Sequence, residues 1–244
     1  MGKRMKILAI DSSALAGSVA VLDGDRLLAE TFVNTSNTHS ETLLPMAAEV
    51  LDRAELTADD IDLFAVTTGP GSFTGVRIGV SMVKGLAFGK NKPCVGVSTL
   101  DALAAGLKEL KGIIVSVVDA RRCGLYNAVF ISDGARVERL TPDKLDMPED
   151  LASEVTALAK EKRMNIYFAG DGYDKAMSAA EGARVKPTPV PLRLTSAYCV
   201  AMAAIDRYES AADTSAFTDT ALAAVYIRPT EAERERLAKL ENNK

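Results

Sequence analysis

The sequence of this chain contains an internal repeat with a long period. A predicted strand ends at Ile10-Asp11 and its hairpin turns at Asp23-Gly24, and the same order returns as Val118-Asp119 and Asp133-Gly134. The two spacings differ by only two residues. Asp-Gly between alternating segments is typical of a hairpin, because glycine adopts the positive φ of a tight turn. A supersecondary unit that recurs in this way indicates a fold built by duplication.

The repeat predicts that the order βββαβα occurs twice. Apolar periodicity places the first copy in strands 5–11, 17–22, 26–33 and 61–68 and helices 38–54 and 73–88, followed by a strand at 93–97 and a helix at 98–110. It places the second copy in strands 112–119, 125–131, 135–140 and 164–169 and helices 148–162 and 173–180. This order predicts an α/β protein of the actin-like (ASKHA) class, a duplication of two ribonuclease-H-like halves.

The same pattern predicts how the chain is divided. We expect an N-terminal half at 1–110 and a second, degenerate half at 111–194. The helix at 195–210 is expected to pack back on the first half. Residues 211–244 are expected to form a loose segment and a charged tail.

The composition excludes several classes of protein. A formal net charge of −4 over 244 residues argues against a broad nucleic-acid-binding surface. No apolar run is long enough to span a membrane. One histidine and three dispersed cysteines fall short of the usual tetrahedral zinc ligand set, so we expect no bound transition metal. Cysteines without a CxxC spacing are typical of reduced thiols, which predicts a cytoplasmic protein.

A glycine turn at 69–72 leads from a predicted buried strand into a helix, with Ser72 as its N-cap. In actin-like proteins ATP normally lies between the halves, and a turn at a helix N-terminus is a candidate anion site. The candidate nucleotide-binding residues are Asp11, Ser12, Gly69, Gly71, Ser72 and Asp119. The alternative is favoured: the glycines let helix and strand pack closely, and the two aspartates only finish their strands. No glycine follows closely after either aspartate to cradle a phosphate.

The helix at 73–88 is apolar over most of its circumference. Only Arg77, Ser81 and Lys84 share a polar sector, with Phe88 beside them. An ordinary helix on a sheet has an apolar stripe roughly 100° wide, and this helix has roughly twice that width. We therefore expect two buried sides, one against its own sheet and one against another surface. A core helix buried within one domain remains the alternative.

Several motifs together resemble the bacterial TsaB (YeaZ) family. They are Lys6 to Asp11, His39-Ser40-Glu41-Thr42-Leu43-Leu44-Pro45, the stretch 69–79 and Val95-Gly96-Val97-Ser98-Thr99-Leu100, with Asp119-Ala120-Arg121, Tyr126 and Tyr226-Ile227-Arg228 as later landmarks. The resemblance is strong over 5–105, patchy over 112–130 and faint between 140 and 220.

The resemblance implies a non-catalytic scaffold and activator of tRNA modification. The family takes part in making threonylcarbamoyladenosine next to the anticodon of tRNAs that read codons beginning with A. Its partners are TsaD and the ATPase TsaE, so tRNA is expected to be contacted only through the complex. The catalytic TsaD carries a metal-binding HxxxH, whereas the corresponding residues 99–103 here hold no histidine. That absence argues against the older description of the wider family as glycoproteases.

The resemblance also implies that helices of the N-terminal half form the TsaD contact, here those at 39–55 and 73–88. The candidate interface residues are His39, Leu43, Leu44, Met46, Ala47, Val50, Gly75, Val76, Gly79, Met82, Val83 and Leu86. Because so much apolar surface would otherwise be wet, we expect a homodimer in the absence of TsaD. No catalytic residue and no cofactor of its own are expected, although ATP or ADP at the complex interface is compatible with the architecture.

Two other functions remain open. The first is an ATP-dependent kinase or hydrolase that acts alone through the cleft between the halves. The second is a tRNA-binding module that uses Arg228, Arg234 and Arg236 of the tail, although nearby glutamates offset these charges.

Overall fold

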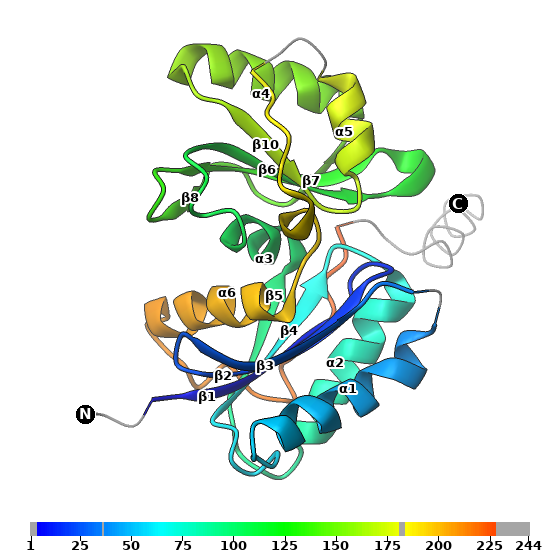
Figure 1. The fold of residues 1–244 in the computed structure, drawn as a ribbon, viewed down its shortest axis with the longest axis vertical. Helices are drawn as coiled ribbons and strands as arrows, with labels where there is room; N and C mark the ends of the chain where they lie inside the picture. Colours follow the sequence, from blue (N-terminus) through cyan, green and yellow to red (C-terminus); the bar gives the residue numbers. More distant parts are fainter. Residues whose placement is uncertain (1–3, 36, 181–183, 228–244) are drawn as a thin grey trace, which may run out of the picture.

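Two sheets form the frame of the molecule, which is a computed structural model (Figure 1). It describes residues 4–35, 37–180 and 184–227. The first sheet has the strand order β3-β2-β1-β4-β5. Its strands are β1 (Lys6–Asp11), β2 (Gly17–Asp23), β3 (Arg26–Val33), β4 (Leu63–Gly69) and β5 (Cys94–Ser98), with helices α1 (His39–Arg53), α2 (Phe73–Ala87) and α3 (Thr99–Ala105).

The second sheet has the order β10-β6-β7-β8, and β9 also pairs with β7. Its strands are β6 (Gly112–Asp119), β7 (Leu125–Ser132), β8 (Val137–Arg139), β9 (Lys144–Asp146) and β10 (Ile166–Ala169). Helices α4 (Pro148–Lys162) and α5 (Tyr173–Ala179) belong to it, and α6 (Ala197–Ser210) follows.

The two sheets repeat one pattern of pairing. Strand β1 is antiparallel to β2 and parallel to β4, and strand β6 is likewise antiparallel to β7 and parallel to β10. Both Asp-Gly hairpin turns form, and Gly24 and Gly134 have φ of 64° and 95°. The α/β, actin-like duplication predicted from the sequence is therefore confirmed, while the boundaries assigned to the halves stay a prediction.

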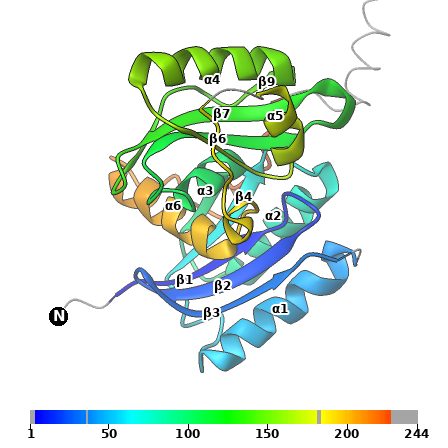
Figure 2. The same ribbon diagram turned by 45° about the horizontal axis from the view of Figure 1, so that its top comes forward.

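The layers alternate between helices and sheets (Figures 1 and 2). Helices α1 and α2 cover one face of the first sheet and α6 covers the other. Helix α3 lies between α6 and the second sheet, and α4 and α5 cover the far face of that sheet. None of the helices in the described ranges is long and apolar enough to cross a membrane.

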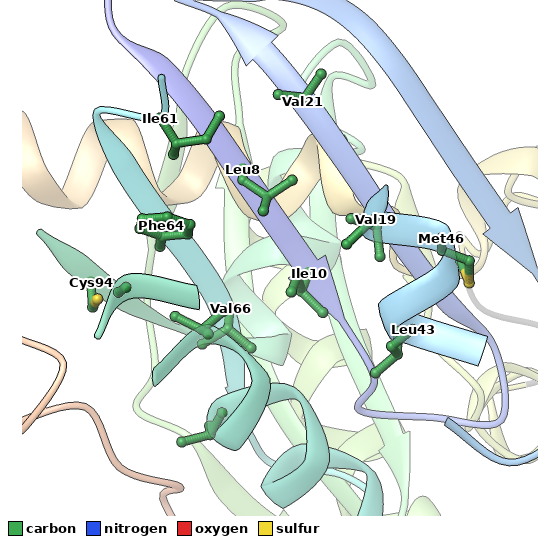
Figure 3. Close-up of a cluster of buried hydrophobic side chains, with 14 of the residues drawn as sticks. Leu8, Ile10, Val19, Val21, Leu43, Met46, Ile61, Phe64, Val66 and Cys94 are labelled. Atoms are coloured by element: carbon green, nitrogen blue, oxygen red, sulfur yellow. The ribbon is translucent and has the colours of Figure 1, made fainter. Parts of the chain in front are cut away.

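Alternation along the strands explains these layers. Leu8 and Ile10 of β1 point toward α1 and α2, in the cluster drawn in Figure 3, while Ile7 and Ala9 point toward α6. A strand buried on both faces reads as a continuous apolar run, which is how β1 and β4 appear in the sequence.

Some elements differ from the sequence prediction. Helix α3 ends at Ala105 rather than at residue 110, because Leu107 and Leu110 pack against the second sheet from tight turns. Strand β9 was missed because it is short and mostly polar, and it forms only by pairing with β7.

The segment after α6 was expected to be loose, yet its described part packs on the first sheet. The Cys94 amide on the edge strand β5 donates to the Phe217 carbonyl (2.9 Å), and the Val225 amide donates to the Thr68 carbonyl (2.8 Å). Leu222 between them is buried in the same core as α2. The charged tail predicted beyond residue 230 lies outside the described residues.

Two glycines of α2 give a test of how this helix packs. A Cβ atom at Gly75 would lie 2.2 Å from the Ser12 carbonyl oxygen, whereas a Cβ atom at Gly85 would meet no atom within 4 Å. Gly75→Ala should therefore lower the free energy of unfolding by about 1–3 kcal/mol through overpacking. Gly85→Ala should raise it by up to about 1 kcal/mol, because alanine favours a helix. Urea unfolding of both variants measures this, and equal effects would contradict the packing.

Candidate functional site

A cleft of about 840 Å³ lies between the two halves, where both carboxylate-ended strands terminate. Ser13, Gly71 and Ser72 line it from the first half, and Asp119 and Asp171 line it from the second. This is the position at which the sequence places the candidate nucleotide-binding residues.

Asp11 is enclosed by its own neighbours. Its side chain is 1% exposed, and its Oδ1 atom accepts from the Ser13 amide (3.1 Å), the Ser13 hydroxyl (2.8 Å) and the Thr67 hydroxyl (2.7 Å). Burial raises the pKa of Asp11, and these hydrogen bonds partly oppose the rise. The carboxyl group thus ties the loop after β1 to the neighbouring strand β4.

The loop after β1 packs directly on the first turn of α2. The Ser72 amide donates to the Ser13 carbonyl (2.6 Å), and the Ser12 hydroxyl donates to the Gly75 carbonyl (2.9 Å). Ser72 is the predicted N-cap, and its hydroxyl accepts from the Gly75 amide (3.2 Å). A Cβ atom at Gly71 would lie 2.2 Å from the Ser13 carbonyl oxygen, so only glycine allows this approach. Close packing within the chain therefore accounts for the turn without any bound anion.

Gly69 has a different neighbour in the same turn. Its φ is 112°, and a Cβ atom there would lie 2.7 Å from the Val225 carbonyl oxygen. The C-terminal segment therefore rests directly on this glycine. Of the six nucleotide candidates, only Gly71, Ser72 and Asp119 line the cleft in the described part of the chain. Asp11 and Ser12 are buried beneath it, and Gly69 lies against the C-terminal segment.

Asp119 lies on the opposite wall of the cleft, in a separate network of hydrogen bonds. It accepts from the Lys175 ammonium group (2.6 Å) and from the Arg121 amide (2.6 Å). Its own amide donates to Asp171 (2.8 Å). In the part of the chain that the structure describes, no three His, Cys, Asp or Glu side chains form a group that could hold a metal ion.

A second hollow, the α1–α2 groove, opens on the outer side of the first half with a volume of about 680 Å³. Its lining is mainly apolar, and Leu44 and Phe73 are 59% and 41% exposed. Helices α1 and α2 run side by side there (Figures 1 and 2). The lining residues are His39, Ser40, Leu43, Leu44, Phe73, Thr74, Arg77, Ile78, Ser81, Met82, Gly85 and Leu86.

The structure divides the twelve candidate interface residues into two groups. Five of them line the groove: His39, Leu43, Leu44, Met82 and Leu86. The other seven are buried against the chain's own sheet or the loop after β1: Met46, Ala47, Val50, Gly75, Val76, Gly79 and Val83. Helix periodicity identified the apolar positions but not which of them face the sheet. The prediction is therefore corrected: the seven buried residues are not available to a partner, and the groove residues are.

Gly79 illustrates this correction. Gly79 was one of the candidate interface residues, but a Cβ atom there would lie 2.3 Å from the Ser12 hydroxyl and 3.2 Å from Val66. The chain's own loop makes the close approach. Substitution of Gly79 would therefore disturb folding rather than report on docking.

Sequence reasoning missed Phe73, Arg77 and Ile78 as groove residues. Arg77 was assigned to the polar sector of the helix and not to the interface, yet it lies at the rim of the groove beside Phe73. Tyr226 contacts both Phe73 and Arg77, and this contact marks them as groove residues. The contact exists only because the C-terminal segment returns to α2. Local periodicity contains no information about that return.

The environment of Asp11 generates a prediction about stability and pH. Because burial raises its folded-state pKa above 3.8, ionisation of Asp11 destabilises the fold at neutral pH, and this penalty disappears as the pH falls through the folded pKa toward 3.8. Asp11→Asn keeps an acceptor oxygen without the charge and should be at least as stable as the natural chain at pH 7, with the difference vanishing below pH 3.8. Asp11→Ala should lose about 1–3 kcal/mol, because the Ser13 and Thr67 hydroxyls lose their acceptor.

Urea unfolding of the three proteins between about pH 3 and pH 7 measures this effect, because the range then extends below the ordinary carboxyl pKa of 3.8. An Asp11→Asn variant that is strongly destabilised at pH 7 but not at low pH would show that the ionised carboxylate is favoured, contrary to this prediction.

Known proteins resemble the chain over most of its length. The sequence model of the family described as "TsaD: tRNA N6-adenosine threonylcarbamoyltransferase" matches residues 33–234. The protein named tRNA threonylcarbamoyladenosine biosynthesis protein TsaB from Bacillus subtilis (strain 168) is 34% identical over 68% of this chain and 71% of its own length. The protein of the same name from Haemophilus influenzae is 36% identical over 70% of this chain and 74% of its own.

The fold is also similar to that of a solved structure, YeaZ from Pseudomonas aeruginosa. The TM-score is 0.76 at 24% identity, and the match covers 91% of this chain and 99% of that one. These matches agree with the motifs at 6–11, 39–45 and 69–79 and with the actin-like duplication. The chain belongs to the TsaB (YeaZ) family.

Proposed function

We propose that this chain is a non-catalytic subunit of the machinery that makes threonylcarbamoyladenosine in tRNA. It docks on TsaD through the α1–α2 groove and activates the transfer of the threonylcarbamoyl group to the adenosine next to the anticodon. The observation that carries the proposal is the groove itself, an apolar surface between two helices that the described chain leaves uncovered. Monomers rarely expose a large apolar patch without an interaction to cover it.

The family relationship supports the choice of partner. The matching sequence model describes the threonylcarbamoyltransferase itself, so this chain and TsaD share an ancestral fold. A complex of two related chains can use pseudo-symmetric contacts, in which each presents the same pair of helices. The same geometry supports a homodimer through the groove when TsaD is absent.

Two features support a role without catalysis. The residues that correspond to the metal-binding HxxxH of TsaD lie on α3, where Thr99 and Leu103 are both buried. Neither side chain ligates a metal through nitrogen or reaches the cleft. The loop after β1, which would have to face a phosphate, is instead hydrogen-bonded to α2. TsaE, and through the complex the tRNA, are the remaining partners of the proposal.

Leu44→Lys tests the docking surface. Leu44 is half exposed, so the variant should fold, but docking would bury an unpaired ammonium group and weaken TsaD binding by about tenfold or more. The matched control is Leu140→Lys, since Leu140 is 41% exposed in the other half and lies outside the groove. The measurements are affinity for TsaD, the mass of the chain alone by light scattering, and tRNA modification with each component omitted in turn.

The expected result is that Leu44→Lys loses TsaD binding, self-association and activation together, while Leu140→Lys retains all three. Full modification by TsaD and TsaE without this chain would remove the activator role. Threonylcarbamoyl transfer or ATP turnover by the chain alone would instead favour the alternative, an enzyme that acts through the cleft of about 840 Å³.

A further inference from the structure

The guanidinium group of Arg77 is held in one position at the rim of the α1–α2 groove. Its Cζ atom lies 3.6 Å from the centre of the Phe73 ring, and its Nε donates to the Tyr226 hydroxyl (2.7 Å). The Phe73 and Tyr226 rings are themselves in contact, with centres 5.2 Å apart. A stacked and hydrogen-bonded arginine has little side-chain freedom left to lose when it binds a ligand.

The path of the C-terminal segment places Tyr226 beside Arg77. Leu222 is buried in the core of the first half, and the Val225 amide is bonded to the Thr68 carbonyl one residue before Tyr226. The segment therefore reaches α2 from a fixed point on the sheet. Residues 149 positions apart in the chain build the arginine site together.

In the described part of the chain, the charge of Arg77 has no acidic counterpart in the groove lining. Among the described residues, Arg77 is the single charged arginine or lysine in the lining, and no Asp or Glu accompanies it. Within the same described ranges only its Nε has a hydrogen-bond partner, which leaves both Nη atoms without a protein acceptor. An occupant of the groove would take water away from this cation, and a buried cation without an acceptor is strongly unfavourable.

We propose that Arg77 binds a carboxylate of the docking partner, and that Tyr226 is the residue that positions it. The occupant is a helix of TsaD with an apolar stripe over Leu44, Ile78 and Met82 and an Asp or Glu that meets the two Nη atoms. This inference rests on the proposed function and adds the chemistry by which the groove selects its partner. The apolar floor supplies affinity, and the arginine rejects a helix that lacks the acidic residue.

The test measures the affinity of the full-length chain for TsaD at low and high salt. Arg77→Met removes the charge and keeps the aliphatic stem, while Arg77→Lys keeps the charge without the planar fork. Tyr226→Phe removes the hydroxyl that holds Nε. Lys84→Met is the matched control, because it removes a cation from α2 outside the groove lining.

Arg77→Met should weaken TsaD binding by about 10- to 100-fold, as expected for the loss of a charge-assisted hydrogen bond. Its affinity should also become less sensitive to salt than that of the natural chain. Arg77→Lys and Tyr226→Phe should lie between these extremes and keep the salt dependence, and Lys84→Met should be unchanged. Thermal unfolding of each variant confirms that it is folded. Should Arg77→Met fail to fold, the affinities of Arg77→Lys and Tyr226→Phe for TsaD test the proposal in its place.

Affinity of folded Arg77→Met within about twofold of the natural chain, the usual error of such comparisons, would overturn the proposal. So would a variant that loses self-association but not TsaD binding, since the occupant would then be a second copy of the chain. The comparison with Leu44→Lys separates the two proposals. If neither variant affects TsaD binding, docking through the groove is wrong; if only Leu44→Lys does, the carboxylate partner alone is wrong.

Discussion

The loop after β1 packs closely on the first turn of α2, and this contact holds the groove helices against the first sheet. Gly71 and Gly75 have no side chain, so the backbone of Ser12 and Ser13 can approach α2 closely enough to share hydrogen bonds with it. The same loop also holds α1, because His39 Nε2 donates to the Ala14 carbonyl (2.7 Å). Both walls of the groove are thus fixed to one loop, which Asp11 in turn ties to the sheet.

This contact separates the chain from what its architecture would otherwise suggest. In an actin-like cleft the loop after the first strand is expected to face a phosphate. Here the Ser13 carbonyl and the Ser12 hydroxyl are bonded to the first turn of α2, and the Ser13 hydroxyl donates to Asp11. Backbone groups that already have partners gain little from a ligand. The duplicated frame is retained, and we infer that its central loop supports the groove rather than a phosphate.

Much of the fold could be predicted from the sequence, because it depends on local signals. Strand alternation, the Asp-Gly turns and the repeat of Asp11 and Asp119 specified the two sheets, and the N-cap at Ser72 formed as expected. The groove was harder to predict. Periodicity marks Gly79 and Met82 equally as positions on an apolar helix, but only the packed structure shows that one faces the sheet and the other the groove. The contact of Tyr226 with Arg77 depends on the path of the whole C-terminal segment, which no local pattern encodes.

We propose that packing of the loop after β1 on α2 has replaced nucleotide binding by this chain on its own. Calorimetric titration of the purified full-length protein with Mg-ATP tests this proposal. We expect no saturable binding up to about 1 mM, which corresponds to less than about 4 kcal/mol of binding free energy. One-to-one binding in the micromolar range that Asp119→Ala abolishes would contradict it, because the cleft would then hold a nucleotide despite the bonds between Ser13 and Ser72.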